Sequence, residues 1–593
     1  MPPACCRSIT PPPTGVTGEL PLHIEALDFC LMKGRHSHLT GWWEGVPILC
    51  LVGEGSAPGP KQILKRKDTM DPHTVSTVVP RTTSQINRRA LCGGAGAALM
   101  AIAGMPSPAE SSSTHNVERR KESTMPVATQ SMASVAIAAA SDPIAELRGQ
   151  LLGQLITPDD PGYDDARRVI YFTVDRHPWA MVRATDARDV ATAINFARDH
   201  DLPLAVRSGG HSLAHQSVID DALVIDFSAM THIRVDAPSQ TARVQPGAIS
   251  GDLATLAAAN GLALSTGDTQ SVGLGGLATG GGIGFMVRKD GLTIDNLLSA
   301  EVVTAAGEIV TASADEHPDL FWAIRGGGGN VGIVTEFTFH LAPVDQILGG
   351  QVILPATREV LRGYLDYMAT APDELTTVAN LMHSPPAPHV PAEQVGKLGL
   401  SVLVCWSGDL EAGEQAIASL RALGTPLAEA IAPMPPPDIY RFTAPQAEPH
   451  AASIRMMFAD DLSDATLDAA LAAMQNASSP FNLVQFRGLG GAMARVPEDA
   501  TAFAHRQQRY WLAVIGLWLD PAEDGAPHEA WTAALWEQVR HEGRGVYVNF
   551  LEDEGPERVH EAYPPATYDR LVEIKRTYDP ENLFRFNQNI PPR

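Results

Sequence analysis

Cysteine is scarce in most of this 593-residue sequence. Only Cys405 lies beyond residue 92, and the other five are Cys5, Cys6, Cys30, Cys50 and Cys92. A folded body with a single thiol has no internal disulfide, no cysteine metal cluster and no cofactor attached through cysteine beside its glycine-rich loops. The sequence also lacks a His-Glu-x-x-His pattern or a comparable run of metal ligands, so we predict no metal site.

Basic residues are few relative to acidic ones. The 44 Lys and Arg residues are outnumbered by 68 Asp and Glu residues, which gives a formal net charge of −24. This balance argues against nucleic acid or an anionic membrane surface as a partner. A hydrophobic content of 44% indicates a globular chain, and 593 residues are enough for more than one domain.

Residues 1–140 differ in character from the rest, because Pro, Ser and Thr clusters interrupt every short apolar run. We expect a disordered preface there. Within it, Arg88-Arg89, an Ala- and Gly-rich stretch and Ala101-Ile102-Ala103 resemble a twin-arginine export signal over residues 88–103. The alternative is a chance arginine pair in a cytoplasmic protein. The 87 residues before the pair are too many for a signal, unless translation begins at Met70. The stretch is too short and too rich in Gly and Ala to predict stable membrane insertion.

The body of the chain shows regular periodicity and no internal repeat. Residues 165–345 alternate amphipathic helices with short apolar strands, as in "DVATAINFARDHDLPLAV". Residues 350–540 carry longer helices interleaved with strands such as "YWLAVIGLWL", which indicates an antiparallel sheet with helices on one face. Residues 545–593 form a closing segment. The predicted fold class is therefore α+β.

One glycine-rich loop has the spacing of a dinucleotide-binding fingerprint, Gly327-x-Gly329-x-x-Gly332. That fingerprint needs a strand before the glycines and a helix after them, because the helix N-terminus holds the pyrophosphate. Here "HPDLFWAIR" before the loop predicts a helix, and "VGIVTEFTFHL" after it predicts a strand. The order is reversed, so a Rossmann domain is excluded.

Two further glycine-rich segments indicate a ligand close to the backbone. "LAVRSGGHS" ends an expected strand at Ser208-Gly209-Gly210-His211, where successive N–H groups can form a nest for phosphate, although a plain glycine turn has the same pattern. "STGDTQSVGLGGLATGGGIGF" places many glycines between Gly267 and Gly284. Each glycine costs roughly 0.5–1 kcal/mol relative to Ala in regular structure, so a bound ligand should offset that cost.

These segments, with "HPDLFWAIRGGGGNVGIVTEF" and the tail "YDRLVEIKRTYDPENLFRFNQNIPP", resemble the berberine-bridge-enzyme-like flavoprotein oxidases. The resemblance covers about residues 165–593 and is closest to the bacterial branch that includes the 6-hydroxynicotine oxidases. It implies a two-lobed FAD-binding domain of the vanillyl-alcohol-oxidase (PCMH) type over residues 165–345. An α/β substrate domain with an antiparallel sheet would occupy residues 350–540, and residues 545–593 would return to complete the FAD domain.

The resemblance also implies roles for individual residues. His211 matches the histidine that bonds covalently to the flavin 8α carbon, with His215 as a structural neighbour. Thr269 stands where many relatives have a second, cysteine tether, so single attachment is expected. The positions matched to FAD contacts are Arg207, Ser208, Gly209, Gly210, His211, Ser212, Thr269, Val272, Gly273, Gly275, Gly276, Gly280, Gly281, Gly282, Gly284, Ile333, Tyr547, Asn549, Asn587 and Asn589.

The identity of the catalytic base stays open at this point. Family members often have a tyrosine base where this chain has Phe550. We therefore take Tyr547 as the first candidate, followed by Tyr440 and Tyr510 in the expected substrate domain. A phenol with a pKa of about 10 needs help from a cation or a hydrogen bond to accept a proton near neutral pH.

The implied activity is FAD-dependent oxidation of a small organic substrate such as an alcohol, a sugar hydroxyl or an amine. Val272 falls where the family gates oxygen beside the flavin, and valine is associated with access, so O₂ is the expected acceptor and H₂O₂ the product. Two alternatives remain: a dehydrogenase that uses another acceptor, and a non-catalytic protein that binds flavin or sequesters a drug on the same fold. Loss of flavin colour with a substrate would separate an enzyme from a binding protein.

Overall fold

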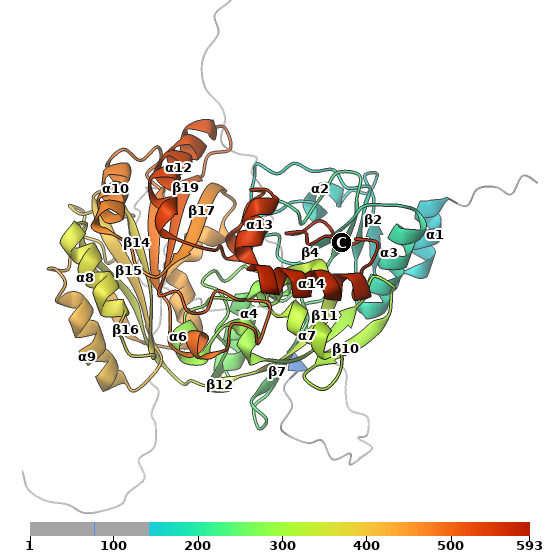
Figure 1. The fold of residues 1–593 in the computed structure, drawn as a ribbon, viewed down its shortest axis with the longest axis horizontal. Coiled ribbons are helices and arrows are strands. Elements are labelled where there is room, and N and C mark those ends of the chain that lie inside the picture. The colour runs from blue at the N-terminus through green and yellow to red at the C-terminus, as the bar shows by residue number, and fades with distance from the viewer. Residues whose placement is uncertain (1–75, 78–141) are drawn as a thin grey trace, which may run out of the picture. The chain divides into compact units, whose positions relative to one another are not determined.

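The computed structural model describes residues 76–77 and 142–593 (Figure 1). The predicted disordered preface and the predicted signal at residues 88–103 lie outside the described residues. None of the helices in the described part combines the length and the apolar character needed to cross a membrane. The predicted α+β class is confirmed: helices pack against one mixed sheet and two larger antiparallel sheets.

A small mixed sheet opens the described body. Strand β5 lies between β4 and β3 and runs parallel to both, and β2 adds an antiparallel edge. Helix α3 covers this sheet with Val190, Ile194 and Ala197, and its first turn is capped by Asp186. The bounds are α1 Pro143–Gln150, β2 Gln154–Ile156, α2 Tyr163–Ala166, β3 Ala180–Arg183, α3 Ala187–Asp199, β4 Leu204–Arg207 and β5 Leu223–Asp226.

A six-stranded antiparallel sheet follows, in the order β1-β6-β7-β11-β9-β10. Helix α7 leads into the Gly326–Gly332 loop and strand β11 leads out of it, so the predicted reversal of the Rossmann order is confirmed. The bounds are β1 Ser76–Thr77, β6 Ile233–Asp236, β7 Thr241–Val244, α4 Ser250–Ala258, β8 Leu262–Ala263, α5 Leu274–Gly280, α6 Val287–Asp290, η1 Thr293–Asn296, β9 Leu297–Val303, β10 Ile309–Ser313, α7 Pro318–Ile324, η2 Gly328–Asn330, β11 Ile333–His340 and β12 Ala342–Pro343.

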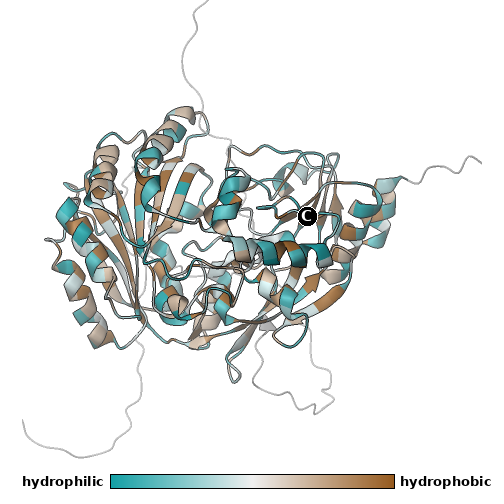
Figure 2. Cartoon of the chain, viewed as in Figure 1, coloured by the Kyte–Doolittle hydropathy of each residue, from teal (hydrophilic) through white to brown (hydrophobic). Residues whose placement is uncertain are grey.

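The third sheet has seven antiparallel strands in the order β16-β13-β15-β14-β18-β19-β17. Helices α8, α9, α10 and α12 cover one face, as predicted; in Figure 2 its strands are largely brown and these helices carry teal hydrophilic surface. The bounds are β13 Ile347–Pro355, α8 Arg358–Met368, β14 Leu375–His383, β15 Leu398–Trp406, α9 Leu410–Arg421, β16 Ala428–Met434, η3 Pro436–Phe442, η4 Ala444–Ala447, β17 Ala451–Ala459, α10 Asp464–Gln475, β18 Leu483–Gly488, α11 Ala492–Arg495, β19 Tyr510–Trp518, α12 Ala526–Val539 and η5 Arg540–Glu542.

The two faces of the seven-stranded sheet have different neighbours because side chains alternate along each strand. On β18, Val484 and Phe486 belong to the core beneath the helices, whereas Leu483 belongs to the core shared with the six-stranded sheet. On β19, Leu512 and Val514 likewise face the helices. Leu483, Gln485 and Arg487 therefore share the face that is turned away from the helices.

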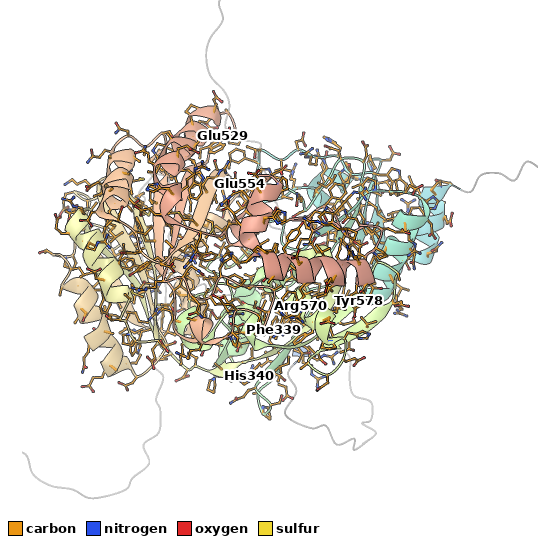
Figure 3. All side chains as sticks on the ribbon, in the orientation of Figure 1. Phe339, His340, Glu529, Glu554, Arg570 and Tyr578 are labelled. Carbon is orange, nitrogen blue, oxygen red and sulfur yellow. The ribbon has the colours of Figure 1, made fainter. Side chains whose placement is uncertain are left out.

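The C-terminal segment packs back onto the six-stranded lobe (Figure 1, red). It contains η6 Val548–Phe550, α13 Pro556–Ala562 and α14 Pro565–Tyr578. Helix α14 lies against α7: the Arg570 guanidinium stands 4.0 Å from the centre of the Trp322 ring, and Arg570 and Tyr578 are labelled in Figure 3. Beyond α14, the chain continues to residue 593 beside the Gly326–Gly332 loop, because the Ile590 N–H donates to Asn330 Oδ1 at 3.0 Å.

Candidate active site

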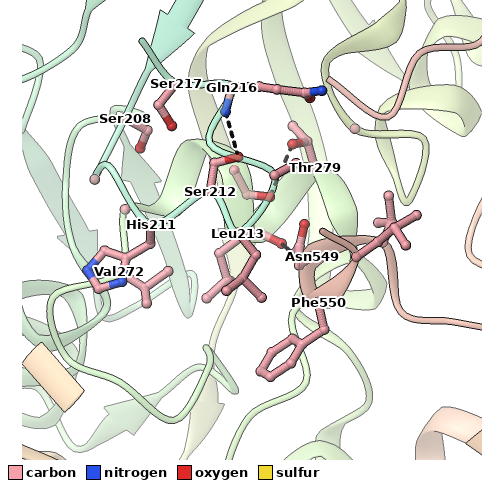
Figure 4. Close-up of a pocket in the computed structure, with 18 of the residues that line it drawn as sticks. Ser208, His211, Ser212, Leu213, Gln216, Ser217, Val272, Thr279, Asn549 and Phe550 are labelled. Atoms are coloured by element: carbon pink, nitrogen blue, oxygen red, sulfur yellow. Dashed lines mark hydrogen bonds between the residues drawn. The ribbon is translucent and has the colours of Figure 1, made fainter. Parts of the chain in front are cut away.

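A cavity of about 420 Å³ lies where these parts of the chain meet (Figure 4). Its volume is within the usual range for small-molecule and cofactor sites, about 300–1,000 Å³. One wall comes from the loop after β4, the glycine-rich segment around Gly273 and the Gly327–Gly332 loop. The opposite wall comes from strands β17, β18 and β19 of the seven-stranded sheet. The C-terminal segment also contributes, with residues 547–551, Tyr563, Phe584, Phe586, Asn587 and Gln588.

The loop after β4 is shaped by close backbone packing. Gly210 has a φ of +74°, a conformation that favours glycine. A Cβ on Gly209 would lie 2.3 Å from the backbone nitrogen of Gly273, so only glycine allows the two loops to approach this closely. Ser208 Oγ donates to the carbonyl of Pro246 at 2.6 Å. The strand therefore turns sharply at its end and brings His211 to the cavity wall.

Other glycines leave room that no protein atom fills. A Cβ on Gly276, Gly328 or Gly329 would meet no heavy atom within 4 Å, and all three line the cavity. In the C-terminal part of the lining, Asn587 Oδ1 is buried and has no hydrogen-bond partner among the described residues. Bare backbone and an unpaired acceptor suit a large flat cofactor with phosphates and ring N–H groups. The residues present thus fit FAD.

His211 is held as a neutral imidazole. Burial, followed by the nearby His450 and Arg207, lowers the pKa of His211 to about 4. Its Nε2 lies 3.0 Å from Ser271 Oγ. His215 does not line the cavity; its ring packs against Tyr171, with ring centres 5.4 Å apart. The geometry therefore brings His211, not His215, to the place where a bound molecule could react with it.

Thr269 also lines the cavity, and its hydroxyl donates to Gln446 Oε1 at 3.1 Å. Gln446 lies in η4, between β16 and β17 of the seven-stranded sheet. A second hydrogen bond links the same two segments in the opposite direction: Thr443 Oγ1 donates to the carbonyl of Asp268 at 2.7 Å. The Thr269 hydroxyl thus connects the glycine-rich segment to the η4 turn.

The structure brings most of the residues matched to FAD into the cavity wall. They are Ser208, Gly209, Gly210, His211, Ser212, Thr269, Val272, Gly273, Gly275, Gly276, Ile333, Tyr547, Asn549 and Asn587. Arg207, Gly280, Gly281, Gly282, Gly284 and Asn589 do not line it. Arg207 instead pairs with Asp226 at 2.9 Å. Gly282 allows close packing, since a Cβ there would lie 2.0 Å from Thr293 Oγ1.

Of the three tyrosines considered as a base, only Tyr547 lines the cavity. Its oxygen accepts hydrogen bonds from the Gly282 N–H at 2.7 Å and from Asn549 Nδ2 at 2.9 Å. Burial raises the pKa of Tyr547 to about 12. The phenol is therefore protonated at neutral pH, and two donors already occupy its oxygen.

The other two tyrosines lie elsewhere. Tyr440 lines a separate cavity of about 20 Å³, where its hydroxyl is 3.0 Å from Thr266 Oγ1. Tyr510 lies in the core beneath the helices and donates to the carbonyl of Leu365 at 2.9 Å. Its neighbour Trp511 lies on the opposite face of β19, in the core shared with the six-stranded sheet. The structure does not bring Tyr440 or Tyr510 to the main cavity.

Sequence reasoning missed the polar side chains of the sheet wall. Arg487 is 4% exposed, forms an ion pair with Asp268, and stacks its guanidinium 4.3 Å from the Trp511 ring centre. Its Nε donates to Gln485 Oε1 at 2.8 Å. The alternation in "LVQFRG" predicts that both side chains share one face of the strand, but it does not predict which face meets the cavity.

His450, immediately before β17, is a second residue that sequence reasoning missed. It lines the cavity with 8% of its surface exposed. Its Nδ1 lies 2.8 Å from the carbonyl of Glu448, so Nδ1 carries the proton and Nε2 keeps its lone pair. Burial lowers the pKa of His450 below its usual 6.5. Backbone hydrogen bonds to Ile170 and Phe172 fix its position, at 3.2 Å each.

Comparison with known proteins agrees with this architecture. Residues 178–313 match the FAD binding domain family, and residues 546–591 match the family described as berberine and berberine like. The (R)-6-hydroxynicotine oxidase of Paenarthrobacter nicotinovorans is 33% identical over 459 residues, which cover 74% of this chain and 97% of that protein. The uncharacterized FAD-linked oxidoreductase YgaK of Bacillus subtilis is 32% identical over 460 residues, covering 75% of this chain and 98% of that protein.

Solved structures show the same fold. The crystal structure of 6-hydroxy-D-nicotine oxidase from Arthrobacter nicotinovorans matches with a TM-score of 0.67 and 30% identity, over 75% of this chain and 98% of that one. A berberine bridge enzyme variant matches with a TM-score of 0.67 at 22% identity, which shows the fold alone. Together with the glycine-walled cavity, these matches establish that the chain belongs to the berberine-bridge-enzyme-like family of FAD-linked oxidoreductases.

Proposed function

We propose that the protein is an oxidase that removes a hydride from a carbon beside an oxygen or nitrogen of a small organic molecule and passes the electrons to O₂, giving H₂O₂. The supporting observation is that one cavity has two different walls. Glycine loops suited to FAD form one wall. Strands β17, β18 and β19 form the other, where the buried polar side chains are Gln485 and Arg487 of β18 and His450 just before β17. FAD supplies the two-electron redox chemistry, while the protein supplies attachment, orientation and proton transfer.

His211 is the proposed attachment point, and Thr269 leaves the cofactor singly attached. In support, His211 lines the cavity as a neutral imidazole, which is the nucleophilic form. Val272 also lines the cavity and is labelled with His211 in Figure 4. A valine beside the reacting edge leaves more space for O₂ than a leucine would, because protein interiors are packed tightly enough for single methylenes to matter.

The sheet wall is proposed to bind the substrate. Arg487 and Gln485 offer hydrogen-bonding groups at its centre, and Asp268 balances the arginine charge. Around them are the apolar side chains Ile454, Leu483, Ile515, Leu517 and Phe550. A charge-balanced polar centre within an apolar surround favours a compact neutral or weakly basic molecule whose polar group is anchored and whose hydrocarbon part is buried.

His450 is proposed to accept the proton that leaves the substrate O–H or N–H. Its Nε2 lone pair is free, because Nδ1 donates to Glu448. Its lowered pKa keeps it neutral at pH 7, whereas Tyr547 has a raised pKa and an oxygen that already accepts two hydrogen bonds. A neutral imidazole has a lone pair ready to accept a proton at pH 7, which a buried, protonated phenol does not.

The test is anaerobic reduction of the purified yellow protein. Candidates include (R)-6-hydroxynicotine, chosen from the relative's name, and small sets of secondary amines, alcohols and sugars, each followed by loss of flavin absorbance. At least one compound should bleach the flavin, and air should restore the colour within seconds with formation of H₂O₂. Reoxidation over minutes would contradict the oxidase and support a dehydrogenase. A flavin that no compound bleaches, but dithionite does, would favour the binding protein.

A further inference from the structure

His211 and Ser271 face each other across two loops that pack with almost no space between their backbones. Gly209 lies so close to Gly273 that a Cβ on either residue would lie 2.3 Å from the other's backbone nitrogen. The carbonyl of Ser271 would be 3.2 Å from that Cβ on Gly209. This close approach fixes the distance between the two side chains, and His211 Nε2 lies 3.0 Å from Ser271 Oγ.

The contact also orients the imidazole ring. His211 lines the cavity, whereas Ser271 does not. Ser271 therefore contacts Nε2 from outside the cavity lining, and Nδ1 makes no hydrogen bond among the described residues. Because the lowered pKa keeps the ring neutral, one nitrogen carries a proton and the other a lone pair. Which nitrogen holds the lone pair depends on the hydrogen bond at Nε2.

The charged and titratable neighbours of His211 form their hydrogen bonds and ion pairs with other residues. Arg207 and His450 are the groups that act on its charge. Arg207 pairs with Asp226 at 2.9 Å and donates to the carbonyl of Arg168 at 3.0 Å. His450 uses its Nδ1 proton on the Glu448 carbonyl. Ser271 is the side chain that bonds the His211 ring, and a hydroxyl can either accept a proton or donate one there.

We propose that Ser271 is the positioning residue for covalent attachment of FAD at His211. Its hydroxyl accepts the Nε2–H, so the lone pair is on Nδ1 and is available to the cavity. The proposal rests on the proposed attachment at His211 and adds the group that prepares it. Ser271 would thus do for His211 what a carboxylate or a second histidine at Nε2 could do, which is to accept the Nε2 proton in a hydrogen bond.

The attachment step balances as follows. His211 Nδ1 forms a bond to the 8α carbon, and one C–H bond of the 8α methyl group breaks. The methyl proton and the imidazole Nε2 proton, which leaves past Ser271, are the two protons released. The electron pair of the C–H bond reduces the isoalloxazine ring, which takes up two protons. O₂ then takes the electron pair and two protons and becomes H₂O₂, so the ring is oxidised again. After the loss of the Nε2 proton, the Ser271 hydroxyl can donate back to the bare nitrogen.

The experiment compares Ser271→Ala and Ser271→Thr with the wild type. Acid precipitation separates covalent flavin in the pellet from released FAD in the supernatant, and fluorescence of the protein band on a denaturing gel confirms the covalent fraction. Each purified protein is then incubated with excess FAD in air, and the covalent fraction is followed over time. Ser250→Ala is the control, because Ser250 is buried at the first position of α4 and bonds the carbonyl of Val272, but does not line the cavity or contact His211.

We expect S271A to bind FAD while attaching it about tenfold more slowly than the wild type, which corresponds to the loss of one hydrogen bond in the reacting arrangement. S271T, which keeps the hydroxyl, should restore attachment, and S250A should match the wild type. Equal covalent fractions and rates in S271A and wild type would overturn the proposal. So would an S271A protein that binds no FAD, since the hydroxyl would then act in binding. A wild type without covalent flavin would instead refute attachment at His211 itself.

Discussion

A buried ion pair at the end of helix α14 gives the sharpest stability prediction. Lys575 Nζ lies 2.7 Å from Asp579 Oδ2, and both side chains are 0% exposed. The ammonium also donates to the carbonyls of Asn330 at 2.8 Å and Phe584 at 2.9 Å, which uses all three of its protons. Asp579 in turn accepts the backbone N–H groups of Leu583 and Phe584, at 2.8 Å each. The pair thus joins α14, the Gly326–Gly332 loop and the tail.

Asp579→Ala removes one partner and leaves a buried ammonium without its counter-charge. The expected loss of unfolding free energy is about 3–5 kcal/mol. Asp319→Ala is the matched control: it breaks the Arg570–Asp319 pair at 3.1 Å, which also involves α14 but lies at its exposed contact with α7, where the side chains are 41% and 68% exposed. Its expected cost is about 1 kcal/mol or less.

Urea unfolding of the two variants and the wild type, followed by tryptophan fluorescence, measures both losses. Asp579→Asn keeps the size of the side chain and an acceptor oxygen for the backbone, so its loss should fall between those of the two alanine variants. The reasoning is refuted if Asp579→Ala costs no more than Asp319→Ala, because burial of the pair would then make no difference.

Three further predictions concern the cavity. Val272→Leu should slow reoxidation of the reduced flavin in stopped flow while leaving reduction by substrate nearly unchanged; equal reoxidation rates would contradict the oxygen gate. Truncation after Pro580 should give colourless, poorly soluble protein, because Phe584, Asn587 and Gln588 complete the wall, and a stable yellow product would argue otherwise. His450→Gln should slow flavin reduction at pH 7 by at least roughly 100-fold. As the pH is lowered, the wild-type reduction rate should stay constant until the lowered pKa of His450 is reached, and should decrease below it because the imidazole becomes charged. The variant should not show this decrease. Tyr171 and His211 are the other titratable groups that face His450.

The sequence was informative wherever local periodicity or a glycine decides the structure. The helix–loop–strand order around Gly326–Gly332 follows from side-chain spacing alone, and it is observed. Glycine density also located the cavity wall, but it could not distinguish a glycine that leaves room for a ligand from a glycine that allows close packing of the chain. Gly276 has open space where a Cβ would be, whereas Gly282 would collide with Thr293. Both are glycines in the same stretch, and only the folded packing separates a ligand contact from a close turn.

The sheet wall could not be predicted because it depends on pairing between distant strands. Strand alternation puts Tyr510 and Trp511 on opposite faces of β19, but the sequence does not say which face meets the cavity. Arg487 reaches Asp268 across 219 positions of sequence, and His450 is held by residues 170–172 of the first lobe. Such contacts exist only after the lobes have packed together. Tyr547 could therefore be predicted from the matched motif, and His450 could not.

The central claim is that the cavity holds FAD bound to His211, and peptide mass spectrometry tests it most directly. Denatured, purified wild-type protein is digested with trypsin, and the peptide Ser208–Arg234 is fragmented. The account predicts the mass of FAD on this peptide, carried by the fragments that contain His211 and retained by those that end before His215. Flavin located on His215, on a peptide that lacks His211, or released entirely on denaturation would contradict it.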